Sequence, residues 1–159
     1  MKAKRVLPLA IKFLVCDEIR REASGKLLMV GFYPGEIVIL NEAIPDKARK
    51  TVGAAQSIAM VFVASQGVGE FDGRLKIVAP NNMTVFDQSV GTVALEVNKT
   101  ATVAAIIRPF PVFAFGEHNV SLFLDEKVFT FSCEIRDGSS LGKTQLTRPK
   151  NRTKKAKRK

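Results

Sequence analysis

A cysteine and two carboxylates stand side by side near the start of the chain, at Cys16, Asp17 and Glu18. A cysteine attacks a substrate only as a thiolate, and a thiolate needs a nearby positive charge, usually a histidine, to lower the pKa of its sulfur. The adjacent charges here are negative and disfavour the thiolate. The only histidine of the chain, His118, lies 102 residues further on. We therefore interpret the triplet as structural and not as a catalytic site.

The same residues predict the end of a β-strand. Phe13 and Val15 alternate on one face, and the chain becomes polar at Asp17. Cys16 is out of phase with them and is expected to face away from the core. Cys133 is in phase with a core face, so a disulfide between the two cysteines is not expected, and a reducing cytosol would disfavour one as well.

His118 follows Glu117, and a histidine beside a carboxylate could do acid–base chemistry. No nucleophile or second base accompanies the pair, so a partly buried histidine at the rim of the fold is the favoured interpretation. One histidine and two cysteines are too few for a typical zinc site. The sequence predicts no catalytic residue, no cofactor-binding residue and no metal ligand, and we expect a protein that is not an enzyme.

Three further segments resemble motifs. Residues 67–73, GVGEFDG, are glycine-rich but lack the lysine and the following helix of a phosphate-binding loop. Residues 98–100 match a glycosylation acceptor, which would not be modified in a cytosol. Residues 108–115, RPFPVFAF, are read either as a proline-rich recognition surface or as an edge strand. The edge strand is favoured, with Phe113 and Phe115 filling the core.

The elements that must carry these residues are strands. In residues 69–80, Phe71, Leu75 and Ile77 alternate with polar residues, a period of two that is typical of a half-buried strand. Residues 118–135 predict a hairpin around a charged loop at 125–127. Other predicted strands are 9–16, 26–33, 36–40, 57–64, 92–97 and 101–108. Strands 9–16, 57–64 and 101–108 are apolar on both faces, which suggests central positions in a sheet, and 41–56 is the one long connection.

About eight short strands without alternating helices predict an all-β fold. The expected architecture is an antiparallel β-sandwich, immunoglobulin-like or jelly-roll-like, formed by residues 1–135. Residues 13–35 are expected to contain a hairpin that turns at Ser24 and Gly25. Gly31, inside its second strand, is compatible with a bulge or a close approach of the backbone.

The net charge of +10 is concentrated at the C-terminus. Residues 136–159 contain ten lysines and arginines and one acid, Asp137, whereas residues 1–135 carry a net charge of +1. With almost no large apolar side chains, 136–159 are predicted to be a disordered basic tail. A tail of this kind could bind the phosphates of nucleic acid, and the candidate binding residues are Lys150, Arg152, Lys154, Lys155, Lys157, Arg158 and Lys159.

Localisation is expected to be cytoplasmic. No apolar run approaches the roughly 20 residues of a membrane-spanning helix. The N-terminus has a basic start and an apolar middle, but Pro8 and Lys12 interrupt it and no small-residue cleavage site follows, so no signal peptide is predicted.

Two stretches carry a resemblance to a known family: FLVCDEIRREASGKLLMVGFYPGEIVI near the start and RPFPVFAFGEHNVSLFLDEKVF near the end. Their order resembles a family of small uncharacterised bacterial β-sandwich proteins over residues 9–135. The resemblance implies the fold and no activity, cofactor or site residue. The chain differs from the family pattern at His118, where an aromatic residue is commoner, and in its basic tail.

These observations predict a non-enzymatic binding or accessory module with an unknown protein partner, no cofactor and no membrane. The alternative is a protein associated with nucleic acid, which binds phosphate or another polyanion nonspecifically through the tail.

Overall fold

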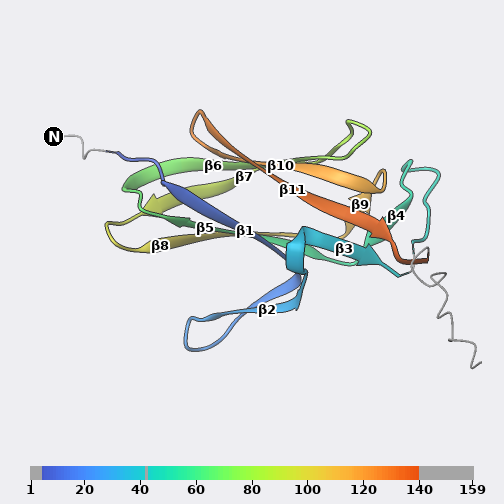
Figure 1. The fold of residues 1–159 in the computed structure, drawn as a ribbon, viewed down its shortest axis with the longest axis horizontal. Helices are drawn as coiled ribbons and strands as arrows, with labels where there is room; N and C mark the ends of the chain where they lie inside the picture. Colours follow the sequence, from blue (N-terminus) through green and yellow to red (C-terminus); the bar gives the residue numbers. More distant parts are fainter. Residues whose placement is uncertain (1–4, 42, 140–159) are drawn as a thin grey trace, which may run out of the picture.

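The computed structural model describes residues 5–41 and 43–139 and shows an all-β protein built from two packed sheets (Figure 1). The candidate nucleic-acid-binding residues, Lys150 to Lys159, and the rest of 140–159 lie outside the described residues. The N-terminal and C-terminal ends of the described chain lie at opposite ends of the sandwich. Within the described residues, no helix is long and apolar enough to cross a membrane.

One layer is a four-stranded sheet with the order β2-β1-β5-β8. Its strands are β1 (Ala10–Arg21), β2 (Leu27–Phe32), β5 (Ile58–Ser65) and β8 (Thr100–Ile107). All neighbouring strands are antiparallel. β1 and β5 are central and β8 is an edge strand. The hairpin made by β2 and the end of β1 projects away from the body of the sandwich (Figure 1).

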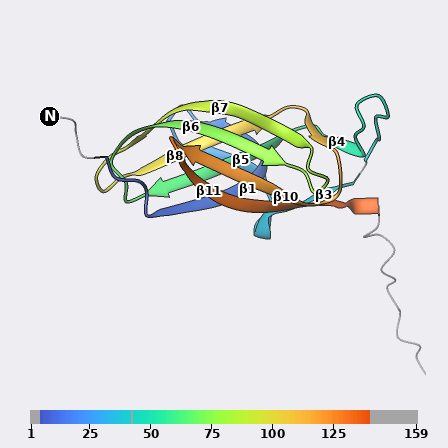
Figure 2. The same cartoon turned by 90° about the horizontal axis from the view of Figure 1, so that it is seen from above.

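The other layer is a five-stranded sheet with the order β3-β11-β10-β6-β7. Its strands are β3 (Ile37–Leu40), β6 (Gly69–Val78), β7 (Thr84–Leu95), β10 (Gly116–Leu124) and β11 (Lys127–Asp137). β3 runs parallel to β11, and every other pair is antiparallel. A short helix, η1 (Pro34–Glu36), leads into β3, and β4 (Gly53–Ala55) pairs with β9 (Phe110–Val112) at one end. Figure 2 shows the five-stranded sheet lying over the four-stranded one.

The core lies between the sheets and consists of the side chains that alternate inward from both. Phe13, Phe62 and Phe131 stack there, with ring centroids 5.1 to 5.5 Å apart, and join strands from the two layers. Such aromatic packing adds to the stabilisation from buried area. The predicted alternation in β6 is confirmed, since Phe71, Leu75 and Ile77 are buried.

Four details of the strand prediction were wrong. β1 continues five residues beyond Cys16, so the acidic pair lies inside a strand and not at its end. Residues 101–108, predicted to be central, form the edge strand β8. β7 begins at Thr84, eight residues before the predicted strand 92–97, because its first half lacks the regular apolar alternation on which that prediction rested. In 108–115 the residues fully buried in the core are Phe110 and Val112; Phe115 is half-buried and packs against the core as predicted, whereas Phe113 is only half-buried.

The predicted hairpin between β1 and β2 is confirmed, with Gly25 at a positive φ of 82° in its turn. Gly31 also has a positive φ, 65°, and lies opposite Asp17. A Cβ on Gly31 would lie 1.9 Å from Asp17 Oδ2, so only glycine fits beneath this carboxylate. The close approach predicted for Gly31 is therefore made by a side chain, without a bulge.

Candidate interaction surfaces

The middle of the outer face of the four-stranded sheet, which points away from the core, is apolar, and Lys12, Thr102, Glu18 and Arg20 lie around it. Directly opposite residues of neighbouring strands share a face. Two such rows cross the middle of this surface: Phe32, Cys16, Ala59 and Ile106, and beside them Leu14, Val61 and Ala104. Cys16, Ala59 and Val61 form a second apolar cluster, separate from the main core. We call this surface the apolar face.

Part of the apolar face is open to solvent. Phe32 is 49% exposed and Ile106 is 44% exposed, on either side of the fully buried Cys16 and Ala59. An antiparallel sheet with one face in water normally places polar side chains on that face. Large contiguous exposed apolar patches on folded proteins are typical of interaction sites.

The hairpin extends the apolar face beyond the sandwich. Every residue of β2 is exposed, and its sequence, LLMVGF, has no polar side chain on either side of the strand. Leu28 and Val30 continue the apolar face from Phe32, whereas Leu27 and Met29 point to the other side of the hairpin. β2 therefore shows apolar side chains on both faces as well as an unpaired edge.

The acidic pair of β1 lines a polar cleft at one end of the apolar face. The open cleft has a volume of about 780 Å³. Its lining comprises Asp17, Glu18, Tyr33, Ile39, Leu40, Asn41, Ala54, Ala55, Gln56, Ser57 and Arg108. Alternation turns Asp17 and Glu18 to opposite faces of β1. On the core side, Tyr33 Oη donates a hydrogen bond to Asp17 Oδ1. On the other side, Arg108 contacts both Glu18 Oε1, at 3.5 Å, and Ser57 Oγ, at 3.0 Å.

The ionisable side chains of the cleft interact with one another. Burial, and then the neighbouring Asp17 carboxylate, raise the pKa of Tyr33, so its phenol stays protonated. The Arg20 guanidinium, with Arg108 as a second cation, holds the pKa of Glu18 below its ordinary value. Ser57 Oγ accepts a hydrogen bond from Arg108 Nε. Charged and amide groups in this arrangement can position a polar ligand or the polar rim of an interface.

The two cysteines are free and buried, and they belong to separate clusters. Cys133 lies in the main core between the sheets, whereas Cys16 lies in the cluster on the outer side of the four-stranded sheet. Burial, with Asp17 as a second cause, raises the pKa of Cys16. Burial, with Glu36 as a second cause, raises the pKa of Cys133 to about 12. Both thiols are therefore protonated at neutral pH. As the sequence indicated, Cys16 faces away from the main core, although it is not exposed.

His118 lies in the core and not at the rim. β10 begins at Gly116, two residues before it, so His118 points inward in phase with Val120. It is fully buried, 6.2 Å from the Phe110 ring between centroids, and pairs across the strands with Cys133. Its Nδ1 lies 3.1 Å from the Gly116 carbonyl, while Nε2 has no partner. Burial lowers the pKa of His118. Glu117 is exposed on the outer face, so the two do not form an acid–base pair.

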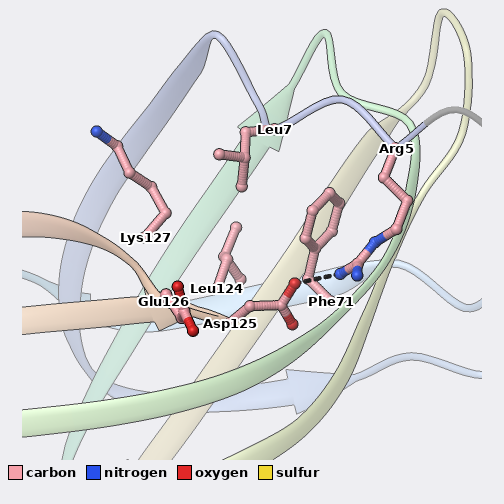
Figure 3. A pocket seen from close by; sticks show the side chains of 7 residues that line it. All are labelled: Arg5, Leu7, Phe71, Leu124, Asp125, Glu126 and Lys127. Atoms are coloured by element: carbon pink, nitrogen blue, oxygen red, sulfur yellow. Dashed lines mark hydrogen bonds and ion pairs between the residues drawn. The ribbon is translucent and has the colours of Figure 1, made fainter.

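A second depression, of about 620 Å³, lies at the opposite end of the sandwich (Figure 3). Arg5 pairs with Asp125 there, and its guanidinium carbon lies 4.5 Å from the centre of the Phe71 ring. Asp125 also accepts a hydrogen bond of 2.8 Å from the backbone of Asp72. These contacts fasten the N-terminal segment to the sheet, so the polar groups are already satisfied by one another.

Sequence reasoning missed the apolar face and the cleft. The signal was present, because 57–64 and 101–108 have apolar residues at both parities, but it was interpreted as central placement in a sheet. In the described part of the chain, no group of three or more histidine, cysteine or acidic side chains could hold a metal ion. No protein-family model matches the chain, and no curated protein matches it. The resemblance to a bacterial β-sandwich family therefore stays a prediction.

Proposed function

We propose that this protein is a non-enzymatic binding or accessory module that recognises a protein partner through the apolar face. One observation carries the proposal: an exposed apolar surface, bordered by charged side chains, lies where an antiparallel sheet would ordinarily be polar. Protein interfaces combine an apolar centre with a polar rim. Phe32, Cys16, Ala59 and Ile106 supply the centre, and Glu18, Arg20 and Arg108 supply part of the rim.

The proposal extends to cellular location and fold type. Two free cysteines suit a reducing compartment, which supports the cytoplasm as the site of action, and the bacterial origin rests on the family resemblance alone. Two facing sheets support an immunoglobulin-like or jelly-roll-like arrangement, although the parallel pairing of β3 with β11 departs from a purely antiparallel one.

A matched pair of residues tests the proposal. Ile106 is 44% exposed on the apolar face, and Val128 is 41% exposed on the outer face of the other sheet. We expect Ile106→Lys to abolish co-purification of a defined partner from the source cells and Val128→Lys to leave it unchanged. Equal effects of the two substitutions, with both proteins folded, would contradict the proposal.

The second candidate is nonspecific binding of nucleic acid by the tail, and seven cations within ten residues favour it. A contact with about five of them predicts a log–log salt slope of roughly −4 to −5 for duplex DNA. Little preference for sequence is expected, because phosphate contacts do not read bases. Duplex binding of the full chain and of residues 1–139 across a salt series measures this. Tight binding by the shortened chain, or salt-independent binding by the full chain, would reject the tail as the binding element.

A further inference from the structure

The outer edge of β2 is an unpaired strand edge in the described structure. β2 is the last strand of its sheet, so one row of its backbone groups has no partner strand. The row can be identified from the pairing with β1. Tyr33 N donates to Val15 O at 2.9 Å, which makes that pair hydrogen-bonded. Because bonded and non-bonded pairs alternate, Leu28, Val30 and Phe32 direct their N–H and C=O groups away from β1.

This edge lacks the features that keep edge strands from pairing. Natural edges are protected by a charged side chain, a proline, a bulge or a covering segment. None of the six residues of β2 is charged or a proline, and its register with β1 does not shift, although Gly31 has a positive φ of 65°. Its apolar side chains are exposed on both faces. An edge of this kind offers hydrogen bonds and apolar contacts to another strand.

We propose that β2 pairs with β2 of a second copy of this chain, in antiparallel orientation about a two-fold axis at Val30. Only the register that places Val30 opposite Val30 pairs all three outward residues, since Leu28 then faces Phe32 in both directions. Registers shifted by two residues pair only two of them. The interface is isologous, as expected for a symmetric dimer.

The side chains and charges at β2 suit this register. Phe32 of each copy packs beside Leu28 of the other, an aromatic–aliphatic pair across the strands. In this register Lys26, just before β2, falls opposite Pro34 of the other copy, and none of the six residues of β2 is charged. No like charges therefore face one another along the paired strands.

Pairing would join the two four-stranded sheets into one continuous sheet, with β2 and its copy at the centre. The apolar faces of the two copies would then lie on the same side of that sheet and double the surface available to a partner. The inference rests on the proposed function in using this face, but it concerns the strand edge and can fail separately.

Cysteine cross-linking in the full chain tests the register. Opposite residues of a hydrogen-bonded pair have Cα atoms about 5.5 Å apart, which a disulfide can span. Under mild oxidation, Val30→Cys is expected to convert most of the protein to a covalent dimer. The matched control is Leu28→Cys, because the two copies of residue 28 lie about 14 Å apart along the strands. No covalent dimer at position 30, or equal yields at both positions, would overturn the proposal.

Sedimentation of the unmodified chain provides the second measurement. The mass is expected to double from 17.4 kDa at concentrations up to the order of 100 µM, a range that reaches weak interfaces. Val30→Pro removes only an outward N–H and should give a monomer, whereas Val30→Thr keeps that donor and should remain a dimer. A monomeric wild-type chain would refute self-pairing. The proposed function would still stand if the chain were monomeric and Ile106→Lys, but not Val128→Lys, abolished co-purification of the partner.

Discussion

The two sheets of this protein differ most on their outer faces. On the five-stranded sheet, Ser121 lies between Lys76 and Thr130, and Arg74 binds Asp87 at 2.6 Å. The half-buried Phe123 ring there is covered by the Arg74 guanidinium, whose carbon lies 5.3 Å from its centre. On the four-stranded sheet, the corresponding middle rows hold Phe32, Leu14, Ala104 and Ile106, with no charged side chain among them.

The proposed function assigns the partner to the sheet whose outer face is apolar. Both sheets bury their inner faces in the same core, so stability of the sandwich does not require a second apolar surface. The five-stranded sheet follows the usual alternation of buried apolar and solvated polar side chains, so its outer face can remain in contact with water. The four-stranded sheet exposes apolar area that would be better placed against another protein. The structure therefore supports a functional surface on one layer and a scaffold role for the other.

The largest effect is expected from a charge placed under the apolar face. Val61 is 3% exposed on that face, between Leu14 and Ala104 of the neighbouring strands. An aspartate at position 61 would therefore have no cation directly opposite it. Val61→Asp should lower the free energy of unfolding by about 3 kcal/mol or more, because the carboxylate is buried without a partner. Ser121→Asp is the matched change on the other outer face, beside Lys76, and should alter stability by about 0.5 kcal/mol or less. Urea unfolding of both variants measures the contrast, and similar losses would show that the two faces are equally open.

The four-stranded sheet places apolar side chains on its outer face, and the five-stranded sheet has the reverse exception: one polar side chain, His118, points into the core. Its pKa in the folded protein is lowered from the value of 6.5 that holds in the unfolded chain. The unfolded state therefore binds more protons below pH 6.5, and stability is expected to fall as the pH falls through that value. His118→Gln should flatten this part of the curve of unfolding free energy against pH. An unchanged slope between pH 7 and 5 would show that His118 does not titrate on unfolding.

The smallest expected effect is a difference between the alkylation rates of the two buried thiols. Cys16 lies under the apolar face next to the projecting hairpin, whereas Cys133 lies in the main core. Local opening of the hairpin exposes Cys16, while Cys133 requires opening of the sandwich, so Cys16 should be alkylated first in the native protein. Timed alkylation followed by peptide mass spectrometry gives the order, and the denatured, non-reduced chain should show two thiols. A faster reaction at Cys133 would contradict the assignment of the hairpin as the less stable unit.

Sequence patterns were sufficient for the fold class and for most strands, because alternation such as that of Phe71, Leu75 and Ile77 records which face is buried. They were not sufficient for the apolar face. Apolar residues at both parities in 101–108 have two physical causes, burial on both sides of a sheet or exposure at an interface, and the sequence does not distinguish them. The position of His118 depended on where β10 begins, which alternation near a glycine does not fix. The polar cleft joins residues from β1, β5 and the segment after β8, and only the sheet order brings them together.

The most direct test of the account compares one position on each outer face in living cells. A photo-cross-linking amino acid would replace Ile106 in one strain and Val128 in another, at positions of nearly equal exposure. The account predicts a discrete cross-linked product with a protein partner, or with a second copy of the chain, from position 106 and none from position 128. A product from position 128 alone, or none from either position in folded protein, would contradict the claim that the apolar face is the functional surface.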